Sequence, residues 1–456
     1  MTQTSQARGR GVLWTPEHRV TTVALLLVVT LIAFESMGVA TAMPTMVAAL
    51  RGEALYSWPF TTFLVASVVA TVLSGTLGDR RGPGPALLIG PVLFLGGLLV
   101  GGFAHEMGLL LAGRALQGFG AGILLVATSL LIALTYDDRE RPVIYAANAA
   151  AWVLPAVLGP AIAGFITERF GWRWVFLGLS PLVLLGAGLL AVVVRRLPAH
   201  LPSPRQRRAG LVIALGAAGG VAALTWAAQH PSAVALVYGA AGLVVLGVTL
   251  RRLLPAGTLL ARPGLPTVVA SRALISGAYA GMEAYLPLTM TSVHGYGPAD
   301  AGLPLTVTAL GWSAASLAQG QYPDWSRERL LRLGFVLVSA ALALFCLVSQ
   351  PWFPAWAAFA GSAIGGAGMG LAMPSISVLL LRYSPEPERG FNTSAMQLGD
   401  WVGSALAIGF GGVLLGLLGS AARPAVPMTA FAVALVAAAL VGVLVTGRWP
   451  DRVDRR

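Results

Sequence analysis

The sequence predicts an all-α integral membrane protein with fourteen transmembrane helices, in which an inserted helix pair separates two six-helix halves related by pseudo-twofold symmetry. Of the 456 residues, 56% are hydrophobic and 11% are charged. The mean hydropathy is +0.78, so most of the chain cannot face water on every side. Apolar stretches of about 20 residues, the length that crosses a bilayer, recur along the chain. Two glycine-rich segments also match each other at a fixed offset.

The arginines indicate how these spans are oriented. If the chain begins in the cytoplasm, most arginines fall in cytoplasmic loops, and few fall on the opposite side, as the positive-inside rule requires. We therefore expect a multi-pass protein of a bacterial inner membrane with both termini in the cytoplasm. The expected spans are 20–44, 57–77, 84–104, 106–132, 143–167, 173–194, 210–229, 232–253, 266–290, 298–319, 329–349, 353–381, 389–418 and 425–446.

Composition excludes several other classes of protein. The formal charge of +12 would suggest nucleic acid as a partner of a soluble protein, but here the basic residues sit in short loops between spans. Cys346 is the single cysteine, so the sequence predicts no disulfide framework and no thiolate metal site. All five histidines are expected in loops, and no nucleophile motif appears. We expect a protein that is not an enzyme and that uses no metal or other cofactor.

The internal repeat defines the domains. At an offset of 248 residues, GRALQGFGAGILL (113–125) aligns with GSAIGGAGMGLAM (361–373). A parallel repeat of this kind is typical of transporters with two halves. The hairpin 210–253 has no counterpart in either half. The predicted division is a cytoplasmic segment 1–18, a six-helix bundle 19–195, loops with the inserted hairpin 196–261, a second bundle 262–448 and a tail 449–456.

Five ionisable residues fall well inside expected spans. Burying such groups in a bilayer costs several kcal/mol unless they have partners or face water, so each is a functional candidate. The same offset of 248 brings Glu35 onto Glu283. The alternative is an ion pair that only holds helices together. The five are Glu35, Glu283, Asp400, Arg114 and Arg272.

The depth of these residues in the membrane predicts two ion pairs. At 1.5 Å per residue, Glu35 lies roughly 22 Å from the cytoplasmic start of its helix, at about the height of Arg114. Burial raises the pKa of a carboxylate and a nearby arginine lowers it, so a carboxylate with both influences suits reversible proton binding. Arg272 and Asp400 are expected to form a second pair nearer the cytoplasm, on depth alone.

Aromatic residues beside these acids suggest a substrate class. Trp152 occupies the repeat position of Asp400, so one half has an aromatic side chain where the other has a charge. An aromatic face beside carboxylates suits amphipathic organic cations. We expect a substrate cavity with Trp152, Tyr285, Glu283 and Arg272 in its wall. The alternative for the aromatic residues is ordinary packing.

The segment GTLGDRRG (75–82) joins the second and third expected spans, and GQYPDWSR (320–327) occupies the matching junction. A glycine permits close helix approach, and an acid with arginines at a helix end can bridge to a neighbouring helix. We expect a cytoplasmic latch that favours one conformation; the alternative is topological charge alone. The residues concerned are Gly75, Asp79, Arg80, Arg81 and Asp324.

The fifth expected span contains LPAVLGPAIAG (154–164), with Pro155, Gly159, Pro160 and Gly164. Proline removes a helix hydrogen bond and small residues let backbones touch. The pattern predicts a bent, closely packed helix at the interface between halves.

These motifs together resemble the major facilitator superfamily, most closely its fourteen-helix drug:proton antiporter branch. GTLGDRRG resembles the loop motif between helices 2 and 3, RALQGFGAG (114–122) the helix 4 motif, and LGPAIAG the helix 5 motif associated with export. Two departures stand out: Pro83, Gly84 and Pro85 replace the basic residues that usually follow the loop motif, and Glu35 stands nine residues before Pro44 where this branch usually carries aspartate.

The resemblance implies a proton-coupled exporter of lipophilic, often cationic small molecules that works by alternating access. It implies Glu35 as principal proton carrier, Arg114 as its partner, and Glu283 and Asp400 as further acids. The proton gradient would supply the energy, and a monomer in the bilayer is expected. One alternative is a dedicated exporter of one endogenous metabolite or lipid. The other is a non-transporting membrane sensor.

Overall fold

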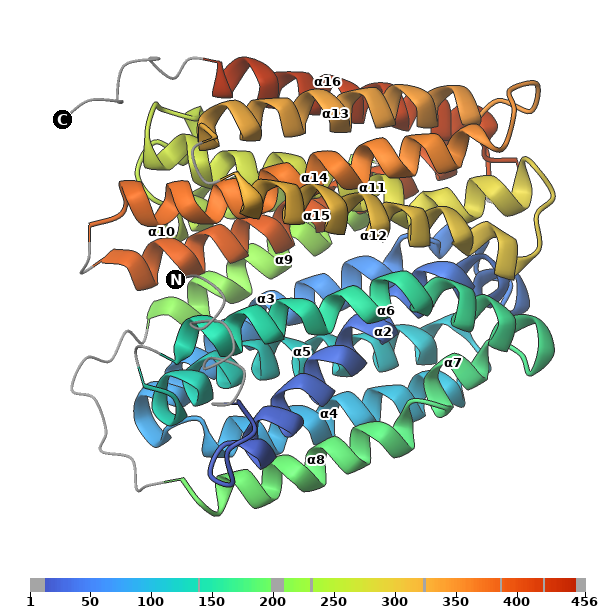
Figure 1. The fold of residues 1–456 in the computed structure, drawn as a ribbon. Coiled ribbons are helices and arrows are strands. Elements are labelled where there is room, and N and C mark those ends of the chain that lie inside the picture. Colours follow the sequence, from blue (N-terminus) through green and yellow to red (C-terminus); the bar gives the residue numbers. More distant parts are fainter. Residues whose placement is uncertain are drawn as a thin grey trace.

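The computed structural model describes residues 13–137, 140–197, 209–229, 233–322, 325–385, 388–420 and 423–447. Within these ranges the chain is helical and forms no β-strand. The long helices lie side by side along one direction (Figure 1). We call the end of the bundle at which the first long helix, α2 (Arg19–Ala49), begins the near end, and the opposite end the far end.

The helices form two groups with a pair between them. The first group continues from α2 with α3 (Trp58–Arg81), α4 (Gly84–Gly102), α5 (Met107–Thr135), α6 (Arg141–Arg169), α7 (Arg173–Leu177) and α8 (Ser180–Val194). The pair is α9 (Ala209–Gln229) and α10 (Ala233–Leu253). The second group is α11 (Leu265–Ser292), α12 (Pro298–Gln321), α13 (Arg327–Val348), α14 (Ala357–Tyr383), α15 (Arg389–Leu418) and α16 (Ala425–Thr446). Short 3-10 turns, η1 (Glu53–Leu55) and η2 (Thr258–Leu260), precede α3 and α11.

Twelve of the described segments are long and apolar enough to cross a membrane. The chain is therefore a multi-pass membrane protein. Neither α9, whose apolar part is 212–227, nor α11 is among the twelve. Helix α11 is 28 residues long and carries Arg272 and Glu283, which lower its hydropathy. The expected number of fourteen spans remains a prediction.

The sixth expected span, 173–194, is broken. Helix α7 ends at Leu177 and α8 begins at Ser180. Pro181 lies in the first turn of α8, and because it has no N–H it cannot donate to the carbonyl of Leu177. The two pieces together still form one apolar segment, Arg173–Val194.

The motif GTLGDRRG stands at the junction of α3 and α4 and is helical as far as Arg81, whereas the second expected span ends at residue 77. Helix α3 runs through it to Arg81 and ends at Gly82, whose φ of 71° suits glycine. The turn between α3 and α4 is therefore very short.

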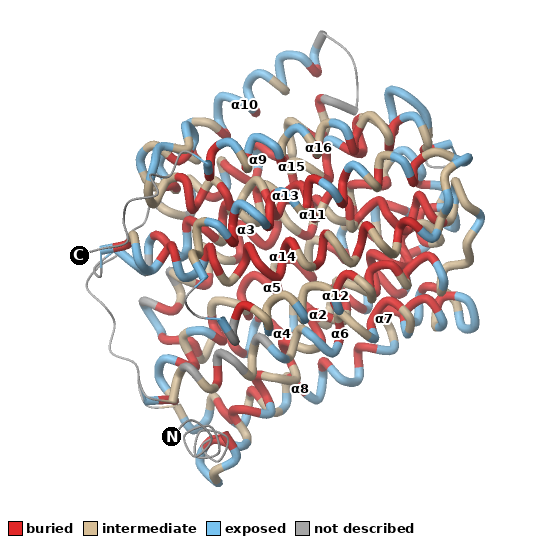
Figure 2. Tube along the Cα trace, turned by 45° about the horizontal axis from the view of Figure 1, so that its top comes forward, coloured by how far each residue is buried: buried red, intermediate tan, exposed pale blue. Residues whose placement is uncertain are grey.

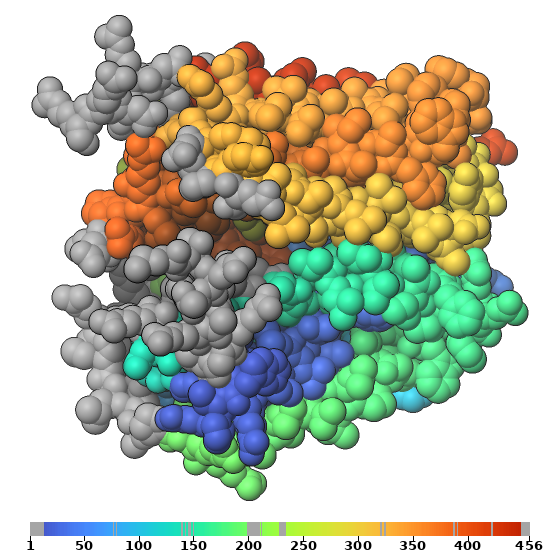
Figure 3. Space-filling view, in the orientation of Figure 1, coloured from blue at the N-terminus to red at the C-terminus, as the bar shows by residue number. Residues whose placement is uncertain are grey.

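The two groups pack in the same way. In the first group α4 packs on α5, α3 on α5 and α2 on α6; in the second group α13 packs on α14, α12 on α14 and α11 on α15. The groups meet along two seams, α6 against α12 and α3 against α15, which the repeat exchanges. Figure 3 shows the first group (blue to green) and the second group (yellow to red) as two blocks, one above the other.

The aligned glycines allow the same close contact between helices in both groups. A Cβ added to Gly118 or Gly122 on α5 would lie 2.3 Å from the Phe63 carbonyl oxygen or 2.6 Å from that of Ser67 on α3. At the repeat positions, a Cβ on Gly366 or Gly370 of α14 would lie 2.1 or 2.3 Å from carbonyl oxygens of α12. These separations leave no room for any side chain, so the glycines permit backbone contact between helices.

We expect Gly118→Val to lower the thermal unfolding temperature of the detergent-solubilised protein, because overpacking a tight contact costs about 1–3 kcal/mol or more. The matched control is Gly96→Val on α4, where an added Cβ meets nothing within 4 Å. Equal unfolding temperatures for the two variants would contradict this account of the helix packing.

Candidate functional site

Glu35 on α2 and Arg114 on α5 form an ion pair inside the first group. The Nη1 atom of Arg114 donates to Oε1 of Glu35 and, at 2.6 Å, to the side-chain oxygen of Gln117. Its Nε donates to the Pro59 carbonyl at 3.1 Å, and its guanidinium carbon lies 4.4 Å from the centre of the Phe63 ring. The side chains of Glu35 and Arg114 are 0% and 4% exposed, so the pair is closed off from its surroundings.

One oxygen of this buried carboxylate is unused. Oε2 of Glu35 has no hydrogen-bond partner among the described residues, and neither has the side-chain nitrogen of Gln117. A buried carboxylate oxygen without a donor is costly, and a proton bound there would remove the buried negative charge that holds Arg114. The arrangement can therefore exist in two states that differ by one proton.

A second ion pair joins α11 and α15. Nη2 of Arg272 donates to Oδ2 of Asp400 at 2.7 Å, and the same oxygen accepts from Nε2 of Gln397 at 3.2 Å. Nη1 of Arg272 lies 2.6 Å from the sulfur of Met373 on α14. The paired side chains are 18% and 19% exposed, so this pair, unlike Glu35–Arg114, is accessible from outside the packed helices.

The predicted acids do not gather at one point. Arg272 precedes Glu283 by eleven residues on α11, which separates them by about 16 Å along the helix. Glu283 is half-buried, and the structure places no described arginine or histidine within ion-pair distance of it. The two ion pairs and Glu283 are therefore three separate places for a charge.

Of the two aromatic residues expected in the substrate cavity, only Trp152 presents surface. It is half-buried on α6. Tyr285 is 0% exposed, and its hydroxyl donates to the Ile408 carbonyl at 2.7 Å. Its ring centre lies 5.2 Å from those of Tyr56 and Phe431. In this structure Tyr285 packs the helices together, and its place in the wall of a substrate cavity stays a prediction.

The latch residues are only partly described. Gly75 lies within α3, where an added Cβ would meet nothing within 4 Å, and Arg80 and Arg81 are exposed in its last turn. The side chain of Asp79 and the whole of Asp324 lie outside the described residues. The latch stays a prediction.

The LGPAIAG segment lies on the α6–α12 seam. A Cβ on Gly164 would come 2.4 Å from the Ala299 Cα, and Oγ1 of Thr306 donates to the Val157 carbonyl at 2.9 Å. Oε1 of Glu168 accepts from the Ala299 backbone N–H at 3.0 Å. These contacts lie toward the far end, so the two groups are in direct backbone contact there and the far end of this seam is closed.

Pro155, Gly159 and Pro160 complete this helix. All three lie inside α6, and a Cβ on Gly159 would come 3.3 Å from Cβ of Met37 on α2. The Pro160 carbonyl lies 3.2 Å from where a Cβ on Gly302 of α12 would stand. Helix α6 therefore uses small residues to approach both α2 and the second group.

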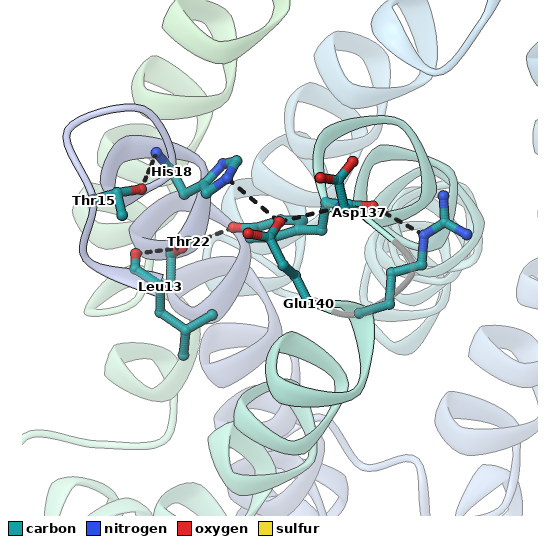
Figure 4. Close-up of polar contacts among 8 residues, drawn as sticks. Leu13, Thr15, His18, Thr22, Asp137 and Glu140 are labelled. Atoms are coloured by element: carbon teal, nitrogen blue, oxygen red, sulfur yellow. Dashed lines mark hydrogen bonds and ion pairs between the residues drawn. The ribbon is translucent and has the colours of Figure 1, made fainter. Parts of the chain in front are cut away.

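A polar cluster that the sequence reasoning missed ties α2 to the end of α5 at the near end (Figure 4). The Thr22 hydroxyl donates to the Leu13 carbonyl at 3.0 Å and lies 2.7 Å from the Tyr136 hydroxyl. The His18 ring is 4.8 Å from that of Tyr136, and its Nε2 is 3.6 Å from Oε2 of Glu140. Burial raises the pKa of Tyr136, which keeps its hydroxyl protonated and able to donate to Thr22.

Two glutamines were also missed. Gln117 follows Arg114 by three residues, and Gln397 precedes Asp400 by three, so each faces its charged neighbour on the same helix. A search for amide side chains one turn from a buried charge would have found both.

We expect Asp400→Asn to weaken substrate binding or turnover without unfolding the protein, because the pair is partly hydrated and its loss costs less than that of a buried pair. Transport measured over a range of concentrations of a lipophilic cation, beside Glu328→Gln at the near end as control, checks this. Unfolding of Asp400→Asn would show instead that the pair mainly holds α11 to α15.

Comparison with known proteins gives the family. A family model described as the Major Facilitator Superfamily matches residues 25–365 and 284–456. The chain belongs to the Major Facilitator Superfamily. Its relatives and its structural neighbours are transporters and not enzymes.

The relatives in the Major Facilitator Superfamily include fungal and bacterial proteins. MFS transporter L2 of Phoma sp. is 26% identical over 421 residues, covering 86% of this chain and 68% of the relative. Efflux pump FUS6 of Gibberella moniliformis is 26% identical over 405 residues (82% and 69%). An uncharacterized MFS-type transporter of Mycobacterium tuberculosis is 27% identical over 447 residues (93% and 65%). This chain thus spans about two thirds of the length of these relatives.

Solved structures support the fold. The crystal structure of an auto-inhibited POT family peptide transporter matches with a TM-score of 0.72 at 16% identity, covering 95% of this chain and 98% of that one. At this identity the match shows the fold alone.

Proposed function

We propose that this chain is a proton-coupled exporter that moves lipophilic, often cationic small molecules out of a bacterial cell. The observation that carries the proposal is the buried Glu35–Arg114 pair with its free carboxylate oxygen. A transporter that exchanges protons for substrate needs a group whose charge can be switched inside the membrane, and this pair meets that need.

The orientation follows from the arginines. The near-end junctions carry arginines such as Arg80, Arg195, Arg251 and Arg382, whereas the far end carries Arg51, Arg169, Arg173 and Arg423. The positive-inside rule assigns the near end to the cytoplasm, with both termini there. The closed far end of the α6–α12 seam then corresponds to a conformation closed to the outside.

The transport cycle would rock one six-helix half, 19–195, against the other, 262–448, around a central site. Proton binding at Glu35 frees Arg114 and favours one conformation, and proton release restores the pair. Asp400, Glu283 and Trp152 would attract a cation with an apolar body, while Asp79 with its arginines would act as a latch at the near end. A monomer driven by the proton gradient, with no cofactor and fourteen spans, completes the proposal.

A second candidate is a dedicated exporter of one endogenous metabolite. One relative, the acurin A biosynthesis cluster MFS-type transporter of Aspergillus aculeatus, is named for a biosynthetic cluster and is 28% identical over 337 residues (70% of this chain, 61% of the relative). Every residue discussed above would serve such a transporter equally well, so the substrate range distinguishes the two.

Inside-out vesicles that contain the protein test the proposal. Vesicles with an acidic lumen should accumulate fluorescent lipophilic cations, and an ionophore that collapses the pH gradient should abolish the accumulation. A resistance profile over lipophilic cations and neutral antibiotics, in an efflux-deficient bacterium, then separates a broad exporter from a dedicated one. Accumulation that continues after the pH gradient has been collapsed would contradict proton coupling.

A further inference from the structure

The inserted hairpin covers one of two equivalent seams. The repeat exchanges the α3–α15 seam with the α6–α12 seam, yet α9 packs on both α3 and α15, and α10 packs mainly on α9. Figure 1 shows α9 passing from the layer of α3 toward that of α15, and Figure 2 shows α10 at the margin of the bundle. The hairpin therefore breaks the pseudo-twofold symmetry on one side only.

Helix α9 crosses its seam diagonally. At the near end, a Cβ on Gly210 would lie 3.5 Å from Cγ1 of Val72 on α3. Toward the far end, a Cβ on Gly409 of α15 would lie 2.9 Å from Oγ1 of Thr225 on α9. One helix thus touches the first group at one end and the second group at the other, and it spans the gap between them.

The exposure of side chains also differs between the two seams. None of the described side chains at 58–78 of α3 or 395–409 of α15 is exposed. On the other seam, Val153 and Leu154 of α6 are 42% and 61% exposed, and Leu310 and Leu317 of α12 are 52% and 69% exposed. These residues lie nearer the near end than the contact of Val157 with Thr306, so the near-end half of the seam presents aliphatic side chains outward.

We propose that the α9–α10 hairpin is a wall that closes the α3–α15 seam to lipid, so that lipophilic substrates enter from the near-end leaflet on the opposite side, between α6 and α12. The entry part of this proposal rests on the proposed function. The wall itself does not.

The side chains of α10 and α6 suit a wall that faces lipid and an entry route for substrate, respectively. The outward face of α10 carries Leu236, Val237, Leu243 and Val244, each more than half exposed, which suits contact with acyl chains. On α6, the exposed Val153 and Leu154 follow the half-buried Trp152 in the same helical turn, so an amphipathic cation that passes the apolar side chains would next meet an aromatic ring.

Spin labels at single cysteines test the wall without any transport assay. In a Cys346→Ser background, labels at Leu154→Cys on α6 and Val72→Cys under α9 are compared with one at Leu184→Cys on α8, whose native side chain is 62% exposed. We expect the labels at 154 and 184 to collide freely with oxygen dissolved in lipid. The label at 72 should do so at least about fivefold less, because packed helices leave no lipid-sized gap.

A label at 72 that displaces α9 would lower the thermal unfolding temperature of the variant, so that temperature is measured beside the oxygen accessibility. Equal oxygen accessibility at positions 72 and 184 would overturn the wall.

Tryptophan substitutions test the entry route. Leu154→Trp and Leu310→Trp, which narrow the α6–α12 side, should slow the accumulation of a fluorescent lipophilic cation several-fold, whereas Leu184→Trp should not. Equal rates in all three variants would overturn the route. If the unsubstituted protein moves no lipophilic cation, the proposed function and the route fail together, while the spin-label comparison still decides the wall.

Discussion

Glu35→Gln should abolish proton-driven accumulation of substrate in inside-out vesicles while leaving the protein folded. Glutamine keeps the shape and can accept a hydrogen bond from Arg114, but it cannot bind and release a proton near neutral pH. Exchange of labelled for unlabelled substrate across the membrane, which needs no net proton movement, should persist. The measurement is the pair of rates, driven accumulation and exchange, in the same vesicles.

Arg114 supplies the comparison that separates coupling from folding. Arg114→Met leaves Glu35 buried without its partner, and breaking a buried ion pair costs about 3–5 kcal/mol, so we expect a clear loss of thermal stability. The double variant Glu35→Gln with Arg114→Met should regain much of that stability and still lack coupling. Unchanged driven accumulation in Glu35→Gln would exclude Glu35 as the proton carrier.

Gly164→Val should stop transport by keeping the far end from closing. The glycine touches the backbone of Ala299 across the α6–α12 seam, where a Cβ would lie 2.4 Å from a main-chain atom, and neither backbone can move aside without parting the helices. A cysteine placed at Thr306, on the same seam, should then react faster with a membrane-impermeant thiol reagent added from the far-end side, in a Cys346→Ser background.

Gly188→Val on α8 is the matched control, because an added Cβ there meets nothing within 4 Å. It should transport normally and keep the cysteine at 306 unreactive. Normal transport by Gly164→Val would show that this contact does not have to form during the cycle.

The features that follow from fixed helix geometry could be predicted from the sequence. A rise of 1.5 Å per residue placed Glu35 level with Arg114 and Arg272 level with Asp400, and the structure brings both pairs together. The glycines aligned by the repeat also occupy equivalent contacts, because duplicated helices pack in the same way. Hydropathy gave the positions of the helices but not their ends, and α3 and α6 are longer than the expected spans.

Features that depend on packing between distant segments could not be predicted. Nothing in the residues around Tyr285 indicates that its hydroxyl meets the Ile408 carbonyl, which is 123 positions away. The place of α9 across one seam likewise depends on two helices that are far from it in the chain. The break between α7 and α8 could have been predicted, because Pro181 follows Ser180 inside an apolar run.

The near-end cluster has a mechanical consequence for the pair above it. Thr22 and Glu35 lie thirteen residues apart on α2, about 20 Å along the helix, and both tie α2 to α5 or its end. These two contacts hold the antiparallel helices together at two levels. In the proposed cycle, a proton bound at Glu35 would release the upper contact and leave the lower one as a pivot. A tilt of about 10° around that pivot would carry Glu35 about 3 Å, farther than a hydrogen bond can stretch.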